Sequence, residues 1–467
     1  MNNLLLKENF KLFILALLVL LSRLPFLNAG YGVEEDSWGI AVAAYHTQLY
    51  GVMEASRLPG HPVNELIYSI FWGHGPWLYN FFSAICSVIC FILFYLTLKK
   101  LNFKNYEWAA LALVFTPVVY INSTCTIDYL WALMFAVAAF YALIHFNLFW
   151  AALFLGLAVG CRINTAVLYI PFLIYIYFEN NKQIEPAQFF KFSFVFGIVS
   201  LLCFIPIICV YGWDFFTYSD QFPYPSIAKI IYKASIGVVG LLAFIVIFIL
   251  LILKFINPNF KSRNLALKYL FFSLTLLQIL AYLMLPQKSA YLMLLVPFGI
   301  LWFADFLNAQ AFKVLCFSLM LSSFVMSVNL TDPYRGAQHS NMVITKTISG
   351  QELFLDPFTG PVISDYTKRL NKLNYTAAVF KEVSKMNAPT IIICGWWFNQ
   401  IIIEQMDAKN NGKVKYAFYL NPKLMEYYLL KGYQIYYLSE QEVYNDLFYK
   451  FSRTKSLASP LLFDYWN

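Results

Sequence analysis

Apolar segments long enough to cross a bilayer follow one another along most of this chain, and they limit its fold more than any other feature. A helix that spans the hydrocarbon core needs about 20 predominantly apolar residues. Candidate segments lie near residues 11–27, 76–98, 106–122, 129–146, 148–162, 165–178, 192–212, 235–254, 268–285, 290–307 and 311–328. The sequence therefore predicts a polytopic α-helical membrane protein with about 11 transmembrane helices.

The charged residues divide the chain in two. Only 12% of the 467 residues are charged, 60% are hydrophobic and the mean hydropathy is +0.61, whereas a soluble chain carries about a quarter charged residues. Of the 58 Asp, Glu, Lys and Arg residues, 27 lie in residues 329–467 and 31 in residues 1–328. This shift predicts a membrane domain over residues 1–328 and a water-facing domain over residues 329–467.

The positive charges of the membrane domain predict its orientation, because cytoplasmic loops carry an excess of Lys and Arg. One side receives Lys99, Lys100, Lys104, Lys182, Lys191, Lys254, Lys261, Arg263, Lys268 and Lys313. The other side, predicted to be extracytoplasmic, receives residues 28–75, residues 123–128, Arg162, residues 213–233, Lys288 and the C-terminal domain. The net charge of +8 thus follows from topology, and no nucleic-acid partner is expected. No small-residue cleavage site follows the first apolar segment, which predicts an uncleaved span.

The C-terminal domain has the pattern of a small α/β unit. Strands are predicted at 390–394, 414–418 and 433–437, with helices near 376–386, 421–430 and 439–452. No Gly-rich phosphate loop follows a strand, which argues against a nucleotide site. Trp396 and Trp397 either stack on a sugar or pack in the core, and packing is favoured. The eight cysteines lack metal or redox spacing and are expected to be packing residues.

The first outward loop, residues 28–75, carries the most informative polar residues. It contains the acidic cluster Glu34-Glu35-Asp36, an amphipathic stretch over 39–50, and then Arg57 and His61 around a Pro-Gly-His-Pro segment. One interpretation of the cluster is a solvated loop. The other is an active-site carboxylate, because a carboxyl group partly withdrawn from water has a raised pKa and can act as a general base.

These features resemble the GT-C glycosyltransferases. An acidic residue soon after the first span, an amphipathic helix and a Pro-Gly-His-Pro segment at 59–62 occur here in that order. The order is most similar to the protein O-mannosyltransferase-like branch, although Asp36-Ser37-Trp38-Gly39 stands where that branch has Asp-Ser-Gly-Glu. The resemblance implies a GT-C-like fold over about residues 10–300. It also implies transfer of a sugar, mannose in this branch, from a polyprenyl-phosphate donor to an extracytoplasmic protein, lipid or glycan, with inversion.

The resemblance also implies roles for individual acidic residues. Asp36 is expected to be the base that deprotonates the acceptor hydroxyl, with Glu35 as its nearest rival. Asp128, which opens the fourth span from outside, matches a second acidic residue of the family. An ordinary N-terminal helix cap remains the alternative for Asp128. Family members differ in metal dependence, so no obligatory metal or cofactor is predicted, and a divalent metal is left open.

Cations are expected to bind the phosphate of the donor and to stabilise it as it leaves. The candidates are Lys288, Arg162 and Arg57, in that order, with His61 and Tyr291 as further substrate-binding residues. Lys288 and Tyr291 resemble the family's basic-aromatic stretch before a late helix, and a snorkelling interfacial lysine is the alternative. Arg162 interrupts an apolar hairpin, where an ionisable residue is a functional candidate. A topology anchor is its alternative.

Two other classes of protein remain as rivals. A secondary transporter or lipid flippase often has paired halves with helices broken at matching positions, and no such pairing is present in this sequence. A non-catalytic membrane scaffold that displays the C-terminal domain is the third interpretation. For the glycosyltransferase interpretation, the expected partners are membrane lipid, a lipid-linked sugar and an acceptor protein, lipid or glycan.

Overall fold

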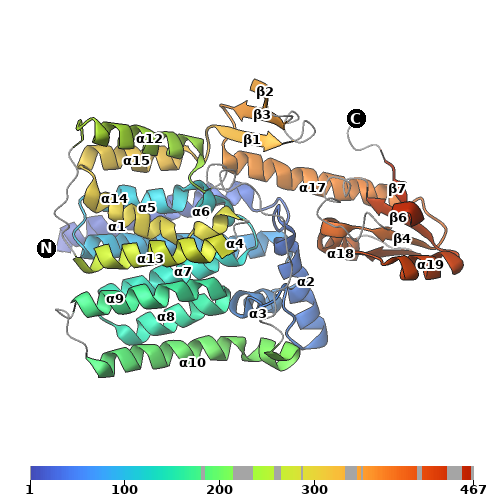
Figure 1. Ribbon diagram of the computed structural model, residues 1–467, viewed down its shortest axis with the longest axis horizontal. Helices are drawn as coiled ribbons and strands as arrows, with labels where there is room; N and C mark the ends of the chain where they lie inside the picture. Colours follow the sequence, from blue (N-terminus) through green and yellow to red (C-terminus); the bar gives the residue numbers. More distant parts are fainter. Residues whose placement is uncertain are drawn as a thin grey trace.

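A computed structural model describes residues 2–179, 185–213, 235–256, 265–284, 288–331, 344–348, 351–407, 413–438 and 455–463. A bundle of long helices forms one part of the molecule, and a smaller unit with two sheets lies at one end of it (Figure 1).

Each of the eleven predicted apolar segments contains a helix or a pair of helices. They are α1 (Asn2–Arg23), α4 (Gly75–Lys100), α5 (Tyr106–Phe115) with α6 (Pro117–Asn122), α7 (Asp128–Ile144), α8 (Leu148–Cys161), α9 (Tyr169–Glu179), α10 (Pro186–Tyr211), α12 (Gly237–Ile252), α13 (Leu265–Met284), α14 (Leu295–Phe306) and α15 (Ala309–Leu321). Within the described ranges, four helices are long and apolar enough to cross a membrane: Lys7–Phe26, Gly75–Lys100, Pro186–Tyr211 and Leu265–Leu283. The other seven are shorter apolar helices, so the number of spans stays a prediction.

The predicted segment 106–122 is divided, which the apolar pattern did not indicate. α5 ends before Thr116, whose backbone is extended, and α6 begins at Pro117. Proline has no N–H to continue the helix and disfavours a helical conformation in the residue before it. Two other segments begin with 3-10 turns, η2 (Ile163–Leu168) and η5 (Ser289–Leu292).

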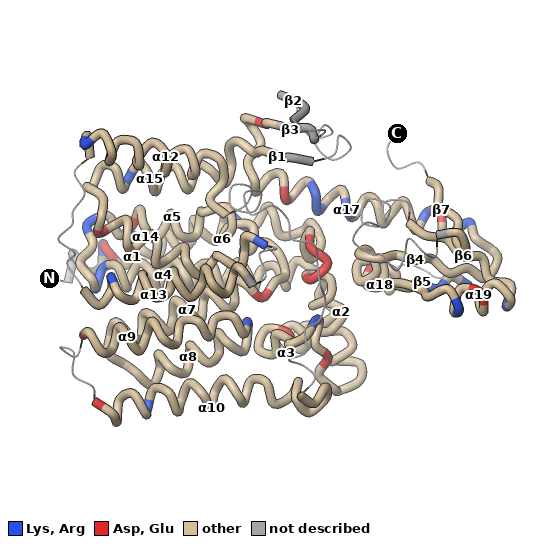
Figure 2. The backbone as a smooth tube through the Cα atoms, in the orientation of Figure 1, with Lys and Arg blue, Asp and Glu red and all other residues tan. Residues whose placement is uncertain are grey.

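The inner helices of the bundle are buried, whereas its outer helices expose large apolar side chains, as expected for a protein in a bilayer. α7 is buried along nearly its whole length, against α4 and α8. In contrast, large side chains such as Leu201, Phe248 and Phe272 are exposed on α10, α12 and α13, where only lipid would cover them. Lys and Arg on these outer helices gather at the end of the bundle where α1 begins (Figure 2). The side of the membrane on which the predicted lysines lie stays a prediction. Lys182, Lys261, Arg263 and most of the 213–233 loop lie outside the described residues.

The opposite end of the bundle carries α2 (Glu35–Tyr50) and α3 (Pro62–Ile70). The predicted amphipathic stretch began at Gly39, so the start of α2 at Glu35 is a correction. Glu35 and Asp36 belong to the first helical turn, with Glu34 as the N-cap residue. The unpaired N–H groups of a first turn favour acidic side chains there, which explains why the helix extends back into the cluster.

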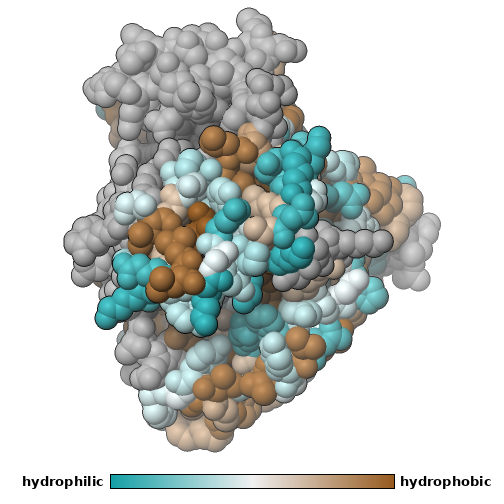
Figure 3. All heavy atoms as spheres, turned by 90° about the vertical axis from the view of Figure 1, so that its right-hand side faces the viewer, coloured by the Kyte–Doolittle hydropathy of each residue, from teal (hydrophilic) through white to brown (hydrophobic). Residues whose placement is uncertain are grey.

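The C-terminal unit contains two sheets. β1 (Ser327–Thr331), β3 (Gln351–Asp356) and β2 (Ile344–Ile348) form an antiparallel sheet in that order, which the sequence did not predict. A parallel sheet has the order β5 (Val414–Ala417), β4 (Thr390–Ile393), β6 (Gln434–Leu438) and β7 (Ser459–Leu461). Its first three strands are the predicted ones. The surface at this end mixes hydrophilic residues with small apolar patches (Figure 3).

The helices of the unit differ more from the prediction. α17 (Pro361–Val383) begins well before residue 376, α18 (Phe398–Asp407) was not predicted, and α19 (Pro422–Leu430) was. The predicted helix at 439–452 lies outside the described residues. Trp397 is buried against Tyr375, with 4.3 Å between ring centroids, so it packs in the core. α17 contacts α6, and α18 contacts α2, which places the unit directly on the end of the bundle.

Candidate active site

The Asp36 carboxylate lies between two cations that come from distant parts of the chain. Its Oδ2 is 2.5 Å from Nη1 of Arg57, in the loop between α2 and α3, and accepts a hydrogen bond from Nζ of Lys288. Lys288 immediately precedes η5 and also contacts Oε2 of Glu34 at 2.6 Å. The Asp36 side chain keeps 25% of its surface exposed.

A second, buried ion pair lies beside the first. Asp128, the first residue of α7, is 2.5 Å through Oδ2 from Nη1 of Arg162 and only 1% exposed. Ile127 is the N-cap residue, and no side chain caps the helix. The interpretation of Asp128 as an N-terminal cap is therefore wrong, and its carboxylate pairs with Arg162 instead. Arg57 joins the two pairs, because its Nη2 is 3.9 Å from Asp128 Oδ1.

Arg162 is enclosed by aromatic rings. Its guanidinium carbon lies 4.2 Å from the ring centroid of Tyr129 and 4.7 Å from that of Tyr291. Stacking and the ion pair with Asp128 together hold the planar guanidinium in one orientation, a property that Arg supplies and Lys does not. The buried, doubly stacked position is not that of a simple topology anchor.

His61 fixes the loop that carries Arg57. Its Nδ1 lies 2.9 Å from the carbonyl oxygen of Cys161, and its Nε2 accepts from Nε of Arg57 at 3.2 Å. These partners assign the tautomer with the proton on Nδ1. Glu65 Oε2 accepts the His61 backbone N–H at 2.9 Å, and Glu65 Oε1 accepts that of Ser56. These hydrogen bonds hold the loop that carries Arg57 in place.

Glu35 points elsewhere, although it is adjacent to Asp36. Its Oε1 accepts the backbone N–H of Asn399 at 2.9 Å, and its Oε2 is buried without a hydrogen-bond partner. Among the described residues it forms no ion pair within 4.0 Å. Burial raises the pKa of Glu35 to about 8, against the opposing effect of the Lys372 charge and the Asn399 N–H. Glu35 was the alternative candidate for the base, but unlike Asp36 it does not contact Arg57 or Lys288.

The electrostatics favour an ionised Asp36. Burial opposes its ionisation, but the charges of Lys288 and Arg57 outweigh this effect and hold the pKa of Asp36 well below its usual range. Burial likewise disfavours the charged Lys288, yet Glu34, Tyr129 and Asp36 raise its pKa well above normal. The cluster is balanced: three carboxylates (Glu34, Asp36 and Asp128) face three cations (Arg57, Arg162 and Lys288).

The structure thus brings together seven of the eight predicted site residues: Asp36, Arg57, His61, Asp128, Arg162, Lys288 and Tyr291. Reasoning from the sequence missed Tyr129, whose hydroxyl is buried without a hydrogen-bond partner while its ring stacks on Arg162. Its position next to Asp128 was the available signal. No group of three or more His, Cys, Asp or Glu side chains placed to hold a metal ion occurs in the described ranges.

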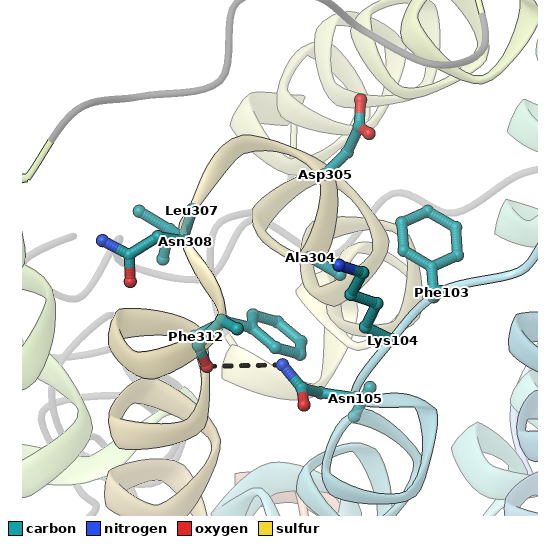
Figure 4. A pocket seen from close by; sticks show the side chains of 10 residues that line it. Phe103, Lys104, Asn105, Ala304, Asp305, Leu307, Asn308 and Phe312 are labelled. Carbon is teal, nitrogen blue, oxygen red and sulfur yellow. Dashed lines mark hydrogen bonds between the residues drawn. The ribbon is translucent and has the colours of Figure 1, made fainter.

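A hollow of about 280 Å³ at the end of the bundle that carries Lys104 is separate from this cluster. Lys104, Asn105, Asp305 and Asn308 line it (Figure 4), and the Asn105 amide donates to the carbonyl oxygen of Ala309 at 3.3 Å. Lys104 is exposed, so the hollow encloses no buried charge.

The apolar bundle, the polar first loop and the sheet-containing unit at the end of the bundle together form a fold that a solved structure shares, and the long apolar helices make the chain an integral membrane protein. The evidence is a likeness to ArnT from Cupriavidus metallidurans, whose crystal structure is bound to undecaprenyl phosphate. The TM-score is 0.51 at 10% identity, over 97% of this chain and 89% of that chain. No family model matches the sequence, and no curated protein matches it either.

Proposed function

We propose that the protein is a membrane glycosyltransferase that moves a sugar from a polyprenyl-phosphate donor to an extracytoplasmic acceptor with inversion. The observation that carries the proposal is the quarter-exposed Asp36 carboxylate between Arg57 and Lys288. It lies at the end of an apolar bundle, where the head group of a lipid whose tail enters the bilayer would be. The fold shared with ArnT, which was crystallised with undecaprenyl phosphate, supports the same substrate class.

The three cations suit a leaving phosphate. Arg57, Arg162 and Lys288 already meet within one cluster, so little reorganisation is needed when a phosphate binds. Positively charged groups fixed in advance stabilise developing negative charge more effectively than water does. The unpartnered hydroxyl of Tyr129 lies on the ring that stacks on Arg162, and we propose that it donates to a phosphate oxygen.

Donor binding would also prepare the base. In the free protein, Lys288 and Arg57 hold the pKa of Asp36 down, which makes it a weak proton acceptor. A bound phosphate would share both cations and add negative charge, and each effect raises the pKa of a neighbouring carboxyl group. Asp36 then takes the proton of the acceptor hydroxyl, whose oxygen bonds to the anomeric carbon. The bond from that carbon to the phosphate oxygen breaks, and the lipid phosphate leaves with the electron pair.

Asp128 has a different part in this proposal. Its carboxylate is almost fully buried and pairs with Arg162, with His61 Nδ1 at 3.6 Å. We propose that it orients Arg162 toward the phosphate and does not itself exchange a proton with the acceptor. Mannose is the sugar that the protein O-mannosyltransferase-like branch suggests, the acceptor is a protein, lipid or glycan, and no obligatory metal is proposed.

A donor screen tests the proposal. The purified protein is incubated with a panel of polyprenyl-phosphate sugars and with peptide, lipid and glycan acceptors, and products are read by mass spectrometry. The proposal expects transfer from at least one donor, with release of polyprenyl phosphate. No transfer from any donor, combined with movement of lipid or solute across proteoliposomes, would instead support a transporter or flippase.

A further inference from the structure

The C-terminal unit contacts the start of α2, one residue away from Asp36. The backbone N–H of Asn399, at the beginning of α18, donates to Glu35 Oε1 at 2.9 Å. One turn further along α2, a Cβ added at Gly39 would lie 3.3 Å from the side chain of Asn399. α18 also contributes Ile402 and Ile403 to the main core of the bundle. The two helices therefore pack closely, with Glu35 between them.

α17 holds the two segments that lead into the site's carboxylates. Lys372 Nζ donates to the carbonyl oxygen of Val33 at 2.9 Å, immediately before the acidic cluster. Arg369 Nη1 donates to the carbonyl oxygen of Thr124 at 2.7 Å, four residues before Asp128. Arg369 is only 1% exposed and pairs with Asp365 at 3.1 Å. A buried arginine with these partners is a specific docking contact, because an unpaired one would be costly.

The two segments are also joined to each other. The backbone N–H of Thr126 donates to the carbonyl oxygen of Tyr31 at 2.7 Å. Asn80 bonds the carbonyl oxygens of Leu27 and Gly30 and accepts from Thr126 Oγ1. A displacement at either docking contact is therefore passed to both carboxylate-bearing segments. A misplacement of about 1 Å can lower a rate about 100-fold, because reacting atoms must meet in a narrow range of geometries.

We infer that the C-terminal unit is a positioning element of the active site, acting through Glu35, Arg369 and Lys372. This inference rests on the proposed function for its catalytic consequence. Glu35 is then a positioning residue that docks α2 on α18, and the neighbouring Asp36 alone faces the cations. The unit contributes no side chain to the cation cluster itself; it holds in place the two segments that carry Asp36 and Asp128.

Two readouts test the inference in the full-length protein. Lys372→Met and Glu35→Ala remove docking contacts and leave the cation cluster intact, and Lys381→Met is the matched control, since Lys381 is an exposed lysine on α17. Hydrogen exchange of peptides covering 28–40 and 122–130 should be faster by about tenfold or more in the first two variants, because local opening frees these amides. Their kcat should fall by about tenfold or more with the KM for the donor nearly unchanged.

Glu35→Gln separates docking from catalysis. The glutamine oxygen can still accept the Asn399 N–H, so exchange and kcat should both stay near wild type, whereas a catalytic base at this position would lose its activity. Exchange and kcat in Lys372→Met and Glu35→Ala that match the Lys381→Met control would overturn the inference. If the wild type transfers no sugar, the proposed function fails, and the exchange measurement still decides whether the unit positions these segments.

Discussion

Replacing Asp36 by Asn isolates the proposed base with little change in shape. General-base catalysis contributes about 10²–10⁴-fold to a rate, so kcat for sugar transfer should fall by that factor. The Asp36, Arg57 and Lys288 side chains are 25%, 28% and 24% exposed, so both cations stay partly solvated when the carboxylate is replaced, and thermal unfolding of the variant is measured alongside its rate.

Donor binding should respond in the opposite direction. In the wild type the carboxylate occupies the space between Arg57 and Lys288. The neutral amide leaves both cations uncompensated, so they should attract an anionic phosphate at least as strongly as before. Affinity for unlabelled polyprenyl phosphate is therefore expected to be equal or higher in Asp36→Asn, while turnover is lost.

The assay follows transfer from a radiolabelled polyprenyl-phosphate sugar in membranes, with lipid binding measured on purified protein. Glu34→Gln is the matched control, because Glu34 contacts the same lysine at 2.6 Å but is 44% exposed. An exposed pair of this kind contributes little, so its rate should stay within about threefold of wild type. A rate for Asp36→Asn within that same range would refute the assignment of Asp36 as the base.

Three further outcomes are expected. Arg162→Lys keeps the charge but loses the stacking on two tyrosine rings at 4.2 and 4.7 Å, so initial rates should show a donor KM higher by about tenfold. Lys288→Met removes a cation that contacts Asp36 and Glu34; the affinity for polyprenyl phosphate should fall, and its dependence on salt should weaken. Glu35 has an ordinary pKa of 4.5 and a folded-state pKa of about 8, so its stabilising contribution is complete below pH 4.5 and is lost as the pH rises through 8. Thermal unfolding between pH 5 and 9 should therefore show a steeper loss of stability in the wild type than in Glu35→Gln.

The membrane bundle is the part of the fold that the sequence by itself determined. Helix formation in an apolar segment depends on neighbours along the chain, because the backbone bonds it needs lie four residues away. For this reason every predicted apolar segment contains a helix. The alternation of residues along the chain likewise predicted three strands of the parallel sheet, whereas it predicted neither the antiparallel sheet of β1–β3 nor helix α18.

The composition of the candidate site could also be predicted, because the residue types of the first loop, together with the resemblance to the GT-C glycosyltransferases, indicated seven of its residues. The pairing among them could not. Lys288 and Asp36 are 252 residues apart, and only tertiary packing decides that they meet. Glu35 and Asp36 are adjacent, yet successive residues on a helix point about 100° apart. Because the C-terminal unit docks on α2, Glu35 accepts a hydrogen bond from α18, whereas Asp36 contacts the cations. Which carboxylate faces the substrate is therefore a property of the packed molecule, because it depends on what covers each side of α2.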